Sequence, residues 1–318
     1  MKKLLSIVLM IMLLTGCSNN ASNQEDGIIR VGVLQLLTHD ALDASYKGFV
    51  DGLKDNGFIE GENLEINYQN PEGDPSNLSS MADSLVNSRP NLLLAIATTP
   101  AQNLMNVNTN IPLLATAITD FEAAGLANDL ITGVSDACLM EDQLALLLEL
   151  KSDIKTLGII YTSSEPNSEI QAKQMEKACK DHGINALIKT VSDKTMIDDT
   201  LQSFKGKIDA LYVPTDNNIA SAMGSVSIFA IDNQLPVLCG ESNPVKNGGL
   251  ISLGVDYYKL GKQTADMASK ILRGEKTVGE LKVETQKDIA VYYNSDTAAK
   301  INLIIPDSIL ERGIDVTK

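Results

Sequence analysis

Strand and helix patterns alternate along almost the whole chain, and the alternating series occurs twice. In the first series, apolar or alternating runs predict strands at residues 28–34, 64–68, 92–97 and 113–118. The second series repeats this order, with predicted strands at residues 156–161, 184–191, 208–213, 236–239 and 250–255 and predicted helices at 167–181, 195–204, 218–232 and 257–273. Alternation of this kind builds parallel sheets with helices on both faces. The predicted fold class is therefore α/β, with two doubly wound parallel-sheet domains side by side.

The first 17 residues have the pattern of an export signal. Two lysines precede an apolar run from Leu4 to Leu14, which is too short to cross a membrane, and the run ends in Leu14-Thr15-Gly16-Cys17. This pattern resembles the bacterial lipobox, whose cysteine receives diacylglycerol. The resemblance implies a lipoprotein signal peptide at residues 1–16, lipidation at Cys17 and a lipid-anchored tether at 17–27. The alternative is a buried N-terminal helix that carries a cysteine by chance.

Length and charge narrow the possible functions. About 300 mature residues exceed what one core usually supports, which favours two domains. Without residues 1–16 the chain keeps 24 basic and 41 acidic residues, a net charge of −17. Such a surface repels nucleic-acid phosphates and anionic lipid headgroups. We therefore expect no nucleic-acid partner, and membrane attachment through acyl chains on an extracytoplasmic protein, in the periplasm or at the cell surface.

Cysteines and histidines are too few and too scattered for metal or redox chemistry. Cys138, Cys179 and Cys239 show no CxxC spacing, so we interpret them as unpaired hydrophobic residues, with one disulfide between two of them as the alternative. His39 and His182 are the two histidines of the sequence. We expect no metal and no cofactor.

Polar residues follow most of the predicted strands. In open α/β sheets, ligands bind beyond the carboxyl ends of the strands. The residues at these positions are Gln35, Thr98, Thr99, Thr119 and Asp120 in the first series, and Ser163, Ser164, Asn167, Ser168, Thr215, Asp216, Asn217, Glu241, Ser242, Asn243 and Asp256 in the second. Hydroxyl and amide groups suit a carboxylate, and aspartates suit an ammonium, so the mixture predicts a zwitterionic ligand. The same residue types are also ordinary helix N-caps, and that interpretation stays open for each of them.

Several segments carry a family resemblance. Residues 158–168, 213–217 and 254–261, supported by 68–70, 95–98 and 298–311, resemble the substrate-binding lipoproteins of ABC importers, in the branch linked to tryptophan and tyrosine uptake. The resemblance extends from about Val31 to the C-terminus. It implies a type I periplasmic-binding fold with three crossovers and a ligand cleft between an N-terminal lobe (residues 28–133 and 257–280) and a C-terminal lobe (134–256 and 281–318).

The same resemblance implies roles for individual residues. The groups expected to hold the ligand carboxylate are Thr98, Ser163, Ser164, Asn167 and Ser168. Asp216 is expected to pair with the ammonium, with Gln35 and Asp256 as second choices for that role or for the cleft rim. Thr99 and Asn217 complete the predicted site. Tyr161 or Tyr257 would stack on the ligand side chain, or else pack in the core.

The expected function is capture of a small zwitterion, an aromatic amino acid such as tryptophan, by closure of the two lobes. The expected partners are this amino acid and an ABC permease, and the expected state is a monomer without enzymatic activity. One alternative is a ligand-sensing module that presents its closed form to a receptor. Another is a hydrolase that uses Asp216 and Asp256 as a carboxylate pair, although the sequence contains no GxSxG, GxGxxG or Walker motif.

Overall fold

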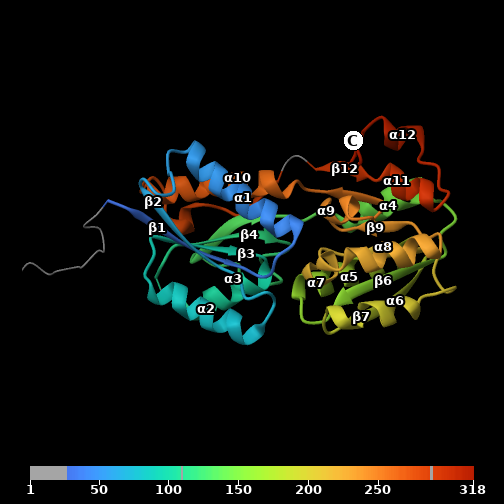
Figure 1. Ribbon diagram of the computed structural model, residues 1–318, viewed down its shortest axis with the longest axis horizontal. Helices are drawn as coiled ribbons and strands as arrows, with labels where there is room; N and C mark the ends of the chain where they lie inside the picture. The colour runs from blue at the N-terminus through green and yellow to red at the C-terminus, as the bar shows by residue number, and fades with distance from the viewer. Residues whose placement is uncertain (1–26, 109, 287–288) are drawn as a thin grey trace, which may run out of the picture.

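The computed structural model describes residues 27–108, 110–286 and 289–318. These residues form two lobes side by side, each built on one sheet with helices on both faces (Figure 1). The strand order is β11-β5-β4-β3-β1-β2 in the first sheet and β13-β12-β10-β9-β8-β6-β7 in the second. The predicted pair of doubly wound α/β domains is confirmed. The predicted signal peptide, Cys17 and most of the tether lie outside the described residues.

The first lobe contains the N-terminal half of the chain and one later helix. Its strands are β1 (Ile29–Gln35), β2 (Leu64–Gln69), β3 (Leu92–Ile96), β4 (Leu113–Ile118), β5 (Ile131–Ser135) and β11 (Glu284–Thr285). Its helices are α1 (Asp40–Asp55), α2 (Pro75–Asn87), α3 (Thr98–Val107) and α10 (Tyr257–Leu272), with a 3₁₀ turn at η2 (Val278–Glu280). The strand pairs of this sheet are parallel, as predicted.

The second lobe holds the remaining elements. Its strands are β6 (Thr156–Thr162), β7 (Asn185–Val191), β8 (Ala210–Val213), β9 (Val237–Cys239), β10 (Ile251–Gly254), β12 (Ala290–Tyr293) and β13 (Gly313–Asp315). Its helices are α4 (Met140–Leu150), α5 (Pro166–Asp181), η1 (Lys194–Met196), α6 (Ile197–Gln202), α7 (Asn217–Ser221), α8 (Met223–Asp232), α9 (Asn243–Lys246), α11 (Ser295–Lys300) and α12 (Asp307–Leu310). β12 runs antiparallel to β10, so this sheet is not purely parallel. The helix expected over residues 218–232 is divided at Ala222 into α7 and α8.

The chain passes between the lobes three times, after β5, after β10 and after β11. The first and third passages come a few residues later than the expected lobe boundaries at 133 and 280. Val134 and Ser135 still belong to β5, and they pair with Glu284 and Thr285 of β11. This pairing satisfies backbone groups at the free edge of β5, which explains why the first sheet extends so far.

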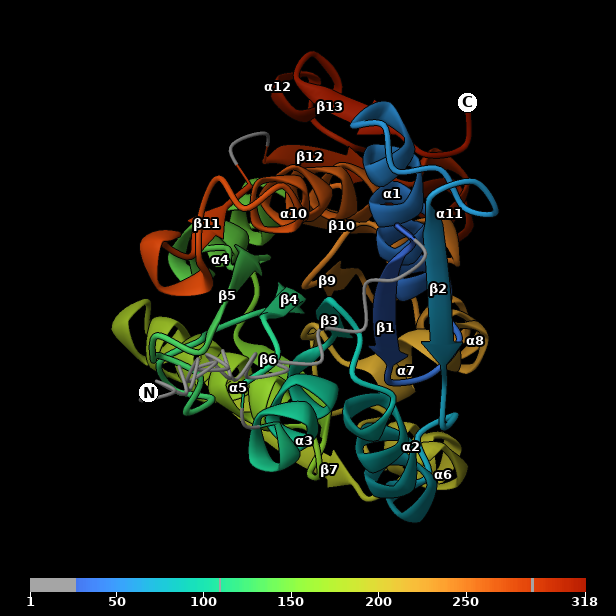
Figure 2. The same cartoon turned by 90° about the vertical axis from the view of Figure 1, so that its left-hand side faces the viewer.

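α10 lies in the first lobe and packs along α1 (Figures 1 and 2). The two backbones approach closely at two glycines. A Cβ atom on Gly48 would lie 2.0 Å from the carbonyl oxygen of Tyr258, and one on Gly261 would lie 2.0 Å from that of Ser45. Glycine is therefore required at both positions for this helix pair to form.

The cysteines of the described residues are free, as expected: Cys179 and Cys239 are buried and Cys138 is half-buried. Burial raises the pKa of the Cys138 thiol to about 12 and that of Cys179 to about 11, so both stay protonated and unreactive near neutral pH. Among the described residues, no helix combines the length and the apolar character needed to cross a membrane.

Candidate functional site

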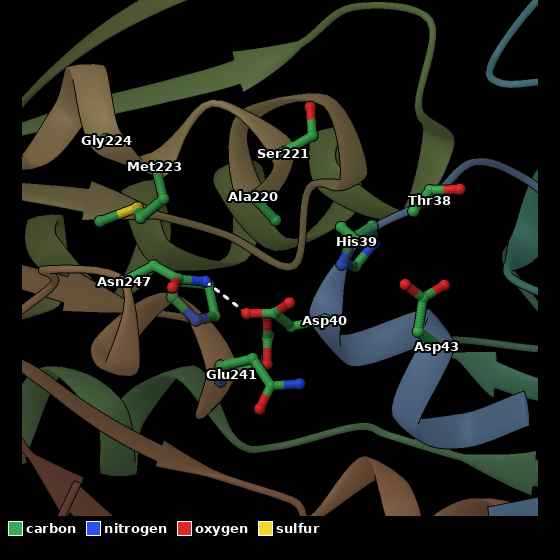
Figure 3. A pocket seen from close by; sticks show the side chains of 12 residues that line it. Thr38, His39, Asp40, Asp43, Ala220, Ser221, Met223, Gly224, Glu241 and Asn247 are labelled. Atoms are coloured by element: carbon green, nitrogen blue, oxygen red, sulfur yellow. Dashed lines mark hydrogen bonds between the residues drawn. The ribbon is translucent and has the colours of Figure 1, made fainter. Parts of the chain in front are cut away.

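A pocket lies between the two lobes, where the carboxyl ends of their strands meet. Its walls come from both lobes, through His39, Ala41, Leu42, Ala117, Asp136, Asn167, Thr215, Asp216, Asn217, Ala220, Glu241 and Tyr257. The enclosed volume is about 10 Å³, room for one water molecule at most. A larger cavity of about 470 Å³ adjoins it and shares His39, Ala220 and Glu241 with it (Figure 3).

Two buried carboxyl groups in this pocket each have one oxygen that finds no hydrogen-bond partner in the described part of the chain. Asp136 follows β5, and its Oδ2 accepts a 2.6 Å hydrogen bond from the Tyr257 hydroxyl. Glu241 follows β9, and its Oε2 accepts from the backbone N–H of Asn243 at 2.7 Å. Within the described residues, Asp136 Oδ1 and Glu241 Oε1 accept no hydrogen bond, although each residue is only 3% exposed. Buried acceptors are normally paired, so this pocket is short of hydrogen-bond donors.

The electrostatics of the pocket lead to the same conclusion. Burial raises the pKa of Asp136, and burial together with the nearby Asp136 charge raises the pKa of Glu241 to about 8. Two carboxylates that repel each other in a dry pocket are stabilised by a cation placed between them. The pocket can therefore hold an ammonium group.

The first lobe also has buried polar side chains close to this pocket, at the ends of its strands. Gln35 lies at the end of β1, and its Nε2 donates to the carbonyl of Leu37 and to Asp43. Its Oε1 is buried without a partner among the described residues. The hydroxyl of Thr119, which follows β4, lies near the Asp136 carboxyl and partly offsets the rise of its pKa. Gln35 is thus near the carboxyl edge of the sheet, as expected, but it is not among the residues that line the pocket.

Asp216 lines the pocket, but protein groups occupy its carboxylate. It caps α7 through a 2.9 Å bond from the Ile219 N–H, and it also accepts from the backbone N–H and the hydroxyl of Thr162 at 2.6 and 2.8 Å. These three donors connect the start of α7 to the end of β6. Asp216 therefore caps α7 and joins it to β6, and both of its carboxylate oxygens accept hydrogen bonds from protein groups.

Asn217 connects the two lobes. Its backbone N–H and its Nδ2 both donate to Glu165 Oε2, at 3.0 and 2.5 Å. Its Oδ1 lies 3.0 Å from His39 Nε2, across the cleft. A second bond between the lobes joins Asn247 Nδ2 to Asp40 Oδ2 at 2.8 Å (Figure 3).

The serine-rich loop before α5 mostly binds its own lobe. Asn167 Nδ2 and Ser168 Oγ donate to the carbonyl of Thr215 at 2.7 and 3.0 Å. Ser163 and Ser164 are exposed, and the Ser163 hydroxyl donates to the carbonyl of Val191. Of these four residues, Asn167 is the one that lines the pocket.

Thr98 and Thr99 begin α3, whose amino end faces the second lobe near α5. No side chain caps this end, because the N-cap position is Ala97. Ala97 has φ +87° and Ala117, at the end of β4, has φ +58°. Residues other than glycine adopt such backbone angles at a cost of about 1–3 kcal/mol, and they cluster at binding sites.

Of three remaining expected residues, Tyr161 and Asp256 lie outside the pocket and Tyr257 lines it. Tyr161 packs on the core of the second lobe, with Glu169 and Lys173 of α5 nearby. Asp256 caps α10, and its backbone N–H and C=O pair with the side chain of Gln286 where the lobes join. Neither residue lines the pocket. Tyr257 does line it, buried, and donates to Asp136.

Asp136, Glu241 and His39 are absent from the predicted site, although Glu241 stood among the polar residues that follow strands. The sequence pattern does not predict β5, and Asp136, which follows this strand, is therefore not predicted as a site residue. The sequence does not indicate a role for His39, apart from the fact that histidine is rare in this chain. Its position depends on the approach of the two lobes.

Comparison with known proteins assigns the family. The model of the ABC transporter substrate binding protein family matches residues 30–317. A tyrosine-binding protein of Clostridioides difficile (strain R20291) is 35% identical over 321 residues, which cover 95% of this chain and 93% of that protein. An ABC domain from Streptococcus pneumonia, solved in complex with L-Trp, has 31% identity and a TM-score of 0.86, covering 90% of this chain and all of that one.

A third relative has a different arrangement of its lobes. The ligand-free, open structure of a substrate-binding protein with adhesive properties from Clostridium difficile is 35% identical, with a TM-score of 0.69, covering 91% of this chain and 99% of that one. The higher score with the ligand-bound structure, together with the two hydrogen bonds between the lobes, indicates that the lobes are closed here. With its type I periplasmic-binding fold, the chain belongs to the ABC transporter substrate-binding protein family.

Proposed function

We propose that this chain captures a free aromatic amino acid, L-tryptophan or L-tyrosine, for an ABC importer. The observation that supports this most is the pair of buried carboxyl groups, Asp136 and Glu241, each with an oxygen that lacks a donor inside a closed interlobe pocket. An α-ammonium has three N–H donors and a positive charge. It therefore satisfies both acceptors and removes the repulsion between them.

The ligand carboxylate would bind at the amino end of α3. The backbone N–H groups there have no side-chain cap, and the positive end of the helix dipole favours an anion. The hydroxyls of Thr98 and Thr99 would add two donors once the lobes close on a ligand, although neither residue lines either cavity in this structure. Asn167 remains a candidate donor because it lines the pocket from the other lobe.

The ligand side chain would extend into the adjoining 470 Å³ cavity. Ala220 and Met223 supply apolar contacts there (Figure 3), and Pro244 also lines this cavity. His39 lies at its boundary with the enclosed pocket. Methionine adapts its shape and makes favourable contacts with aromatic rings. Two relatives, a tyrosine-binding protein and an ABC domain solved in complex with L-Trp, support an aromatic side chain on the ligand.

The wider context is also part of the proposal. Cys17 would carry the lipid anchor outside the cytoplasm, and mass spectrometry of the mature N-terminus tests this. The protein would act as a monomer, and the permease would recognise its closed form. The chain would bind its ligand without catalysis. The carboxylate pair suggested for a hydrolase has no support, because Asp216 and Asp256 each cap a different helix.

Thermal unfolding of the chain from Ser18 onward, with a panel of amino acids, tests the function. A ligand at about 100 times its dissociation constant adds roughly 2.7 kcal/mol to stability. We expect a shift with L-tryptophan or L-tyrosine, and little with N-acetyl-L-tryptophan, which lacks the ammonium. A panel without any response, or an equal response to the acetylated compound, would contradict the proposal.

A further inference from the structure

A hydrogen bond between His39 and Asn217 joins the lobes at the wall between the two cavities. His39 precedes α1 in the first lobe and lines both cavities, whereas Asn217 begins α7 in the second lobe. The two side chains meet at 3.0 Å between Nε2 and Oδ1. Opening the cleft must break this bond.

The protonation state of His39 in the closed form follows from its partners. Glu165 accepts from both nitrogens of Asn217, so the amide oxygen of Asn217 is the atom that faces His39. An amide oxygen only accepts, so Nε2 must carry hydrogen. His39 Nδ1 accepts from the backbone N–H of Ala41 at 3.3 Å and thereby caps α1. Only the neutral ring with hydrogen on Nε2 satisfies both contacts.

We infer that His39 is a latch whose neutral ring holds the lobes closed over the ligand, so that its protonation opens the cleft and weakens binding. The inference rests on the proposed function. A proton on Nδ1 would face the N–H of Ala41 and remove the helix cap. A charged ring would also be buried between the lobes, where no carboxylate forms an ion pair with it among the described residues.

The charged groups around the latch determine the sign of the pH effect. Burial lowers the pKa of His39 below its usual 6.5, and the bond with Asn217 and the charges of Asp43 and Asp40 on α1 only partly oppose this. Opening the cleft returns water to the ring, so the open form binds more protons between that lowered pKa and about 6.5. Acid therefore favours the open form through His39.

Carboxyl groups of the second lobe have the opposite effect on how pH changes the balance between the open and closed forms. Glu165, behind Asn217, and Glu241, on the same cavity wall, have pKa values raised to about 8, mainly by burial. If the open cleft hydrates them, acid favours the closed form through these groups. Protonation of Glu241 also weakens its proposed pairing with the ligand ammonium, so the loss of affinity in acid that belongs to His39 is the part that a non-titrating residue at position 39 removes.

Two substitutions separate the latch from the helix cap. His39→Asn keeps an N-cap of the preferred type, but its side chain is too short to reach Asn217. His39→Gln keeps an N–H donor of sufficient length, and it does not titrate. The affinities for L-tryptophan and L-tyrosine are measured by calorimetry between pH 5 and 7.5.

For the parent chain we expect about a 10-fold loss of affinity from pH 7.5 to 5. Relative to its own affinity at pH 7.5, His39→Gln should lose clearly less affinity in acid than the parent does. His39→Asn should bind about 3–10-fold more weakly than the parent at pH 7.5, and its further loss in acid should be as small as that of His39→Gln. Asn247→Ala, which removes the exposed bond to Asp40, should keep the pH profile of the parent.

Parent-like binding by His39→Asn, or an acid-induced loss in His39→Gln equal to that of the parent, would overturn the latch. If the parent binds neither amino acid, the proposed function fails, and small-angle scattering of the ligand-free chain tests the latch separately. The radius of gyration should then rise from pH 7.5 to 5 in the parent and stay constant in His39→Gln. No rise in the parent would refute the latch.

Discussion

At Glu241, folding favours the neutral acid, whereas binding of an ammonium favours the ionised carboxylate. Its pKa of about 8, raised by burial, means that the neutral acid suits the empty pocket. Its contribution to stability is fully present below about pH 4.5 and is lost as the pH rises through about 8. A bound ammonium reverses this preference, because it pairs with the ionised carboxylate.

Glu241→Gln should therefore stabilise the ligand-free chain and weaken binding. We expect a higher unfolding temperature than that of the parent at pH 8–9, and a difference near zero at pH 5. Affinity for tryptophan should fall roughly 10- to 100-fold, because a charged hydrogen bond is lost. Thermal unfolding and calorimetry measure both effects, with Glu122→Gln on an exposed turn as the control. If the gain in unfolding temperature over the parent is smaller at pH 8 than at pH 5, this assignment is wrong.

Asp216 has a structural role, because its carboxylate binds groups of β6 and α7. Asp216→Ala leaves three donors of Thr162 and Ile219 without an acceptor in a buried site. We expect unfolding in urea to show a loss of about 3 kcal/mol. Asp74→Ala, which removes an exposed cap from α2, should cost about 1 kcal/mol. Similar losses in the two variants would show that the Thr162 bonds contribute little.

At the level of elements, the contact between α1 and α10 fixes the helix that returns from the second lobe. Gly261→Ala would place a methyl group against the backbone of α1, at Ser45. The helices must then separate, at a cost of about 3 kcal/mol. Gly224→Ala in α8 meets nothing within 4 Å and should raise stability by up to about 1 kcal/mol. Urea unfolding of the two variants gives the comparison, and equal effects would contradict the packing described here.

Most elements could be predicted from periodicity, and the exceptions have physical causes. β5 contains Thr132, Gly133 and Ser135, so its apolar run is too short to stand out. β11 has two residues and exists because it pairs with β5. The site was less predictable than the fold, because the same polar residues serve as caps and as ligand contacts. Asp216 proved to be a cap, whereas Glu241 has a free oxygen, and only the three-dimensional contacts distinguish the two.

At the scale of the whole molecule, the closed cleft requires that opening precede binding. An enclosed pocket of about 10 Å³ cannot admit an amino acid. The lobes must separate, and the ligand then favours the closed form because it contacts both of them. The three passages between the lobes, two of them joined by the hydrogen bonds between Asp256 and Gln286, allow such a motion without breaking either sheet.

A crystal structure of the complex with L-tryptophan or L-tyrosine tests the central claim most directly. We expect the lobes to be closed, and the ligand ammonium to lie within hydrogen-bond distance, about 3 Å, of Asp136 Oδ1 and Glu241 Oε1. The carboxylate should lie at the amino end of α3. An ammonium bound elsewhere, with both carboxyl oxygens still unpaired, would contradict the account.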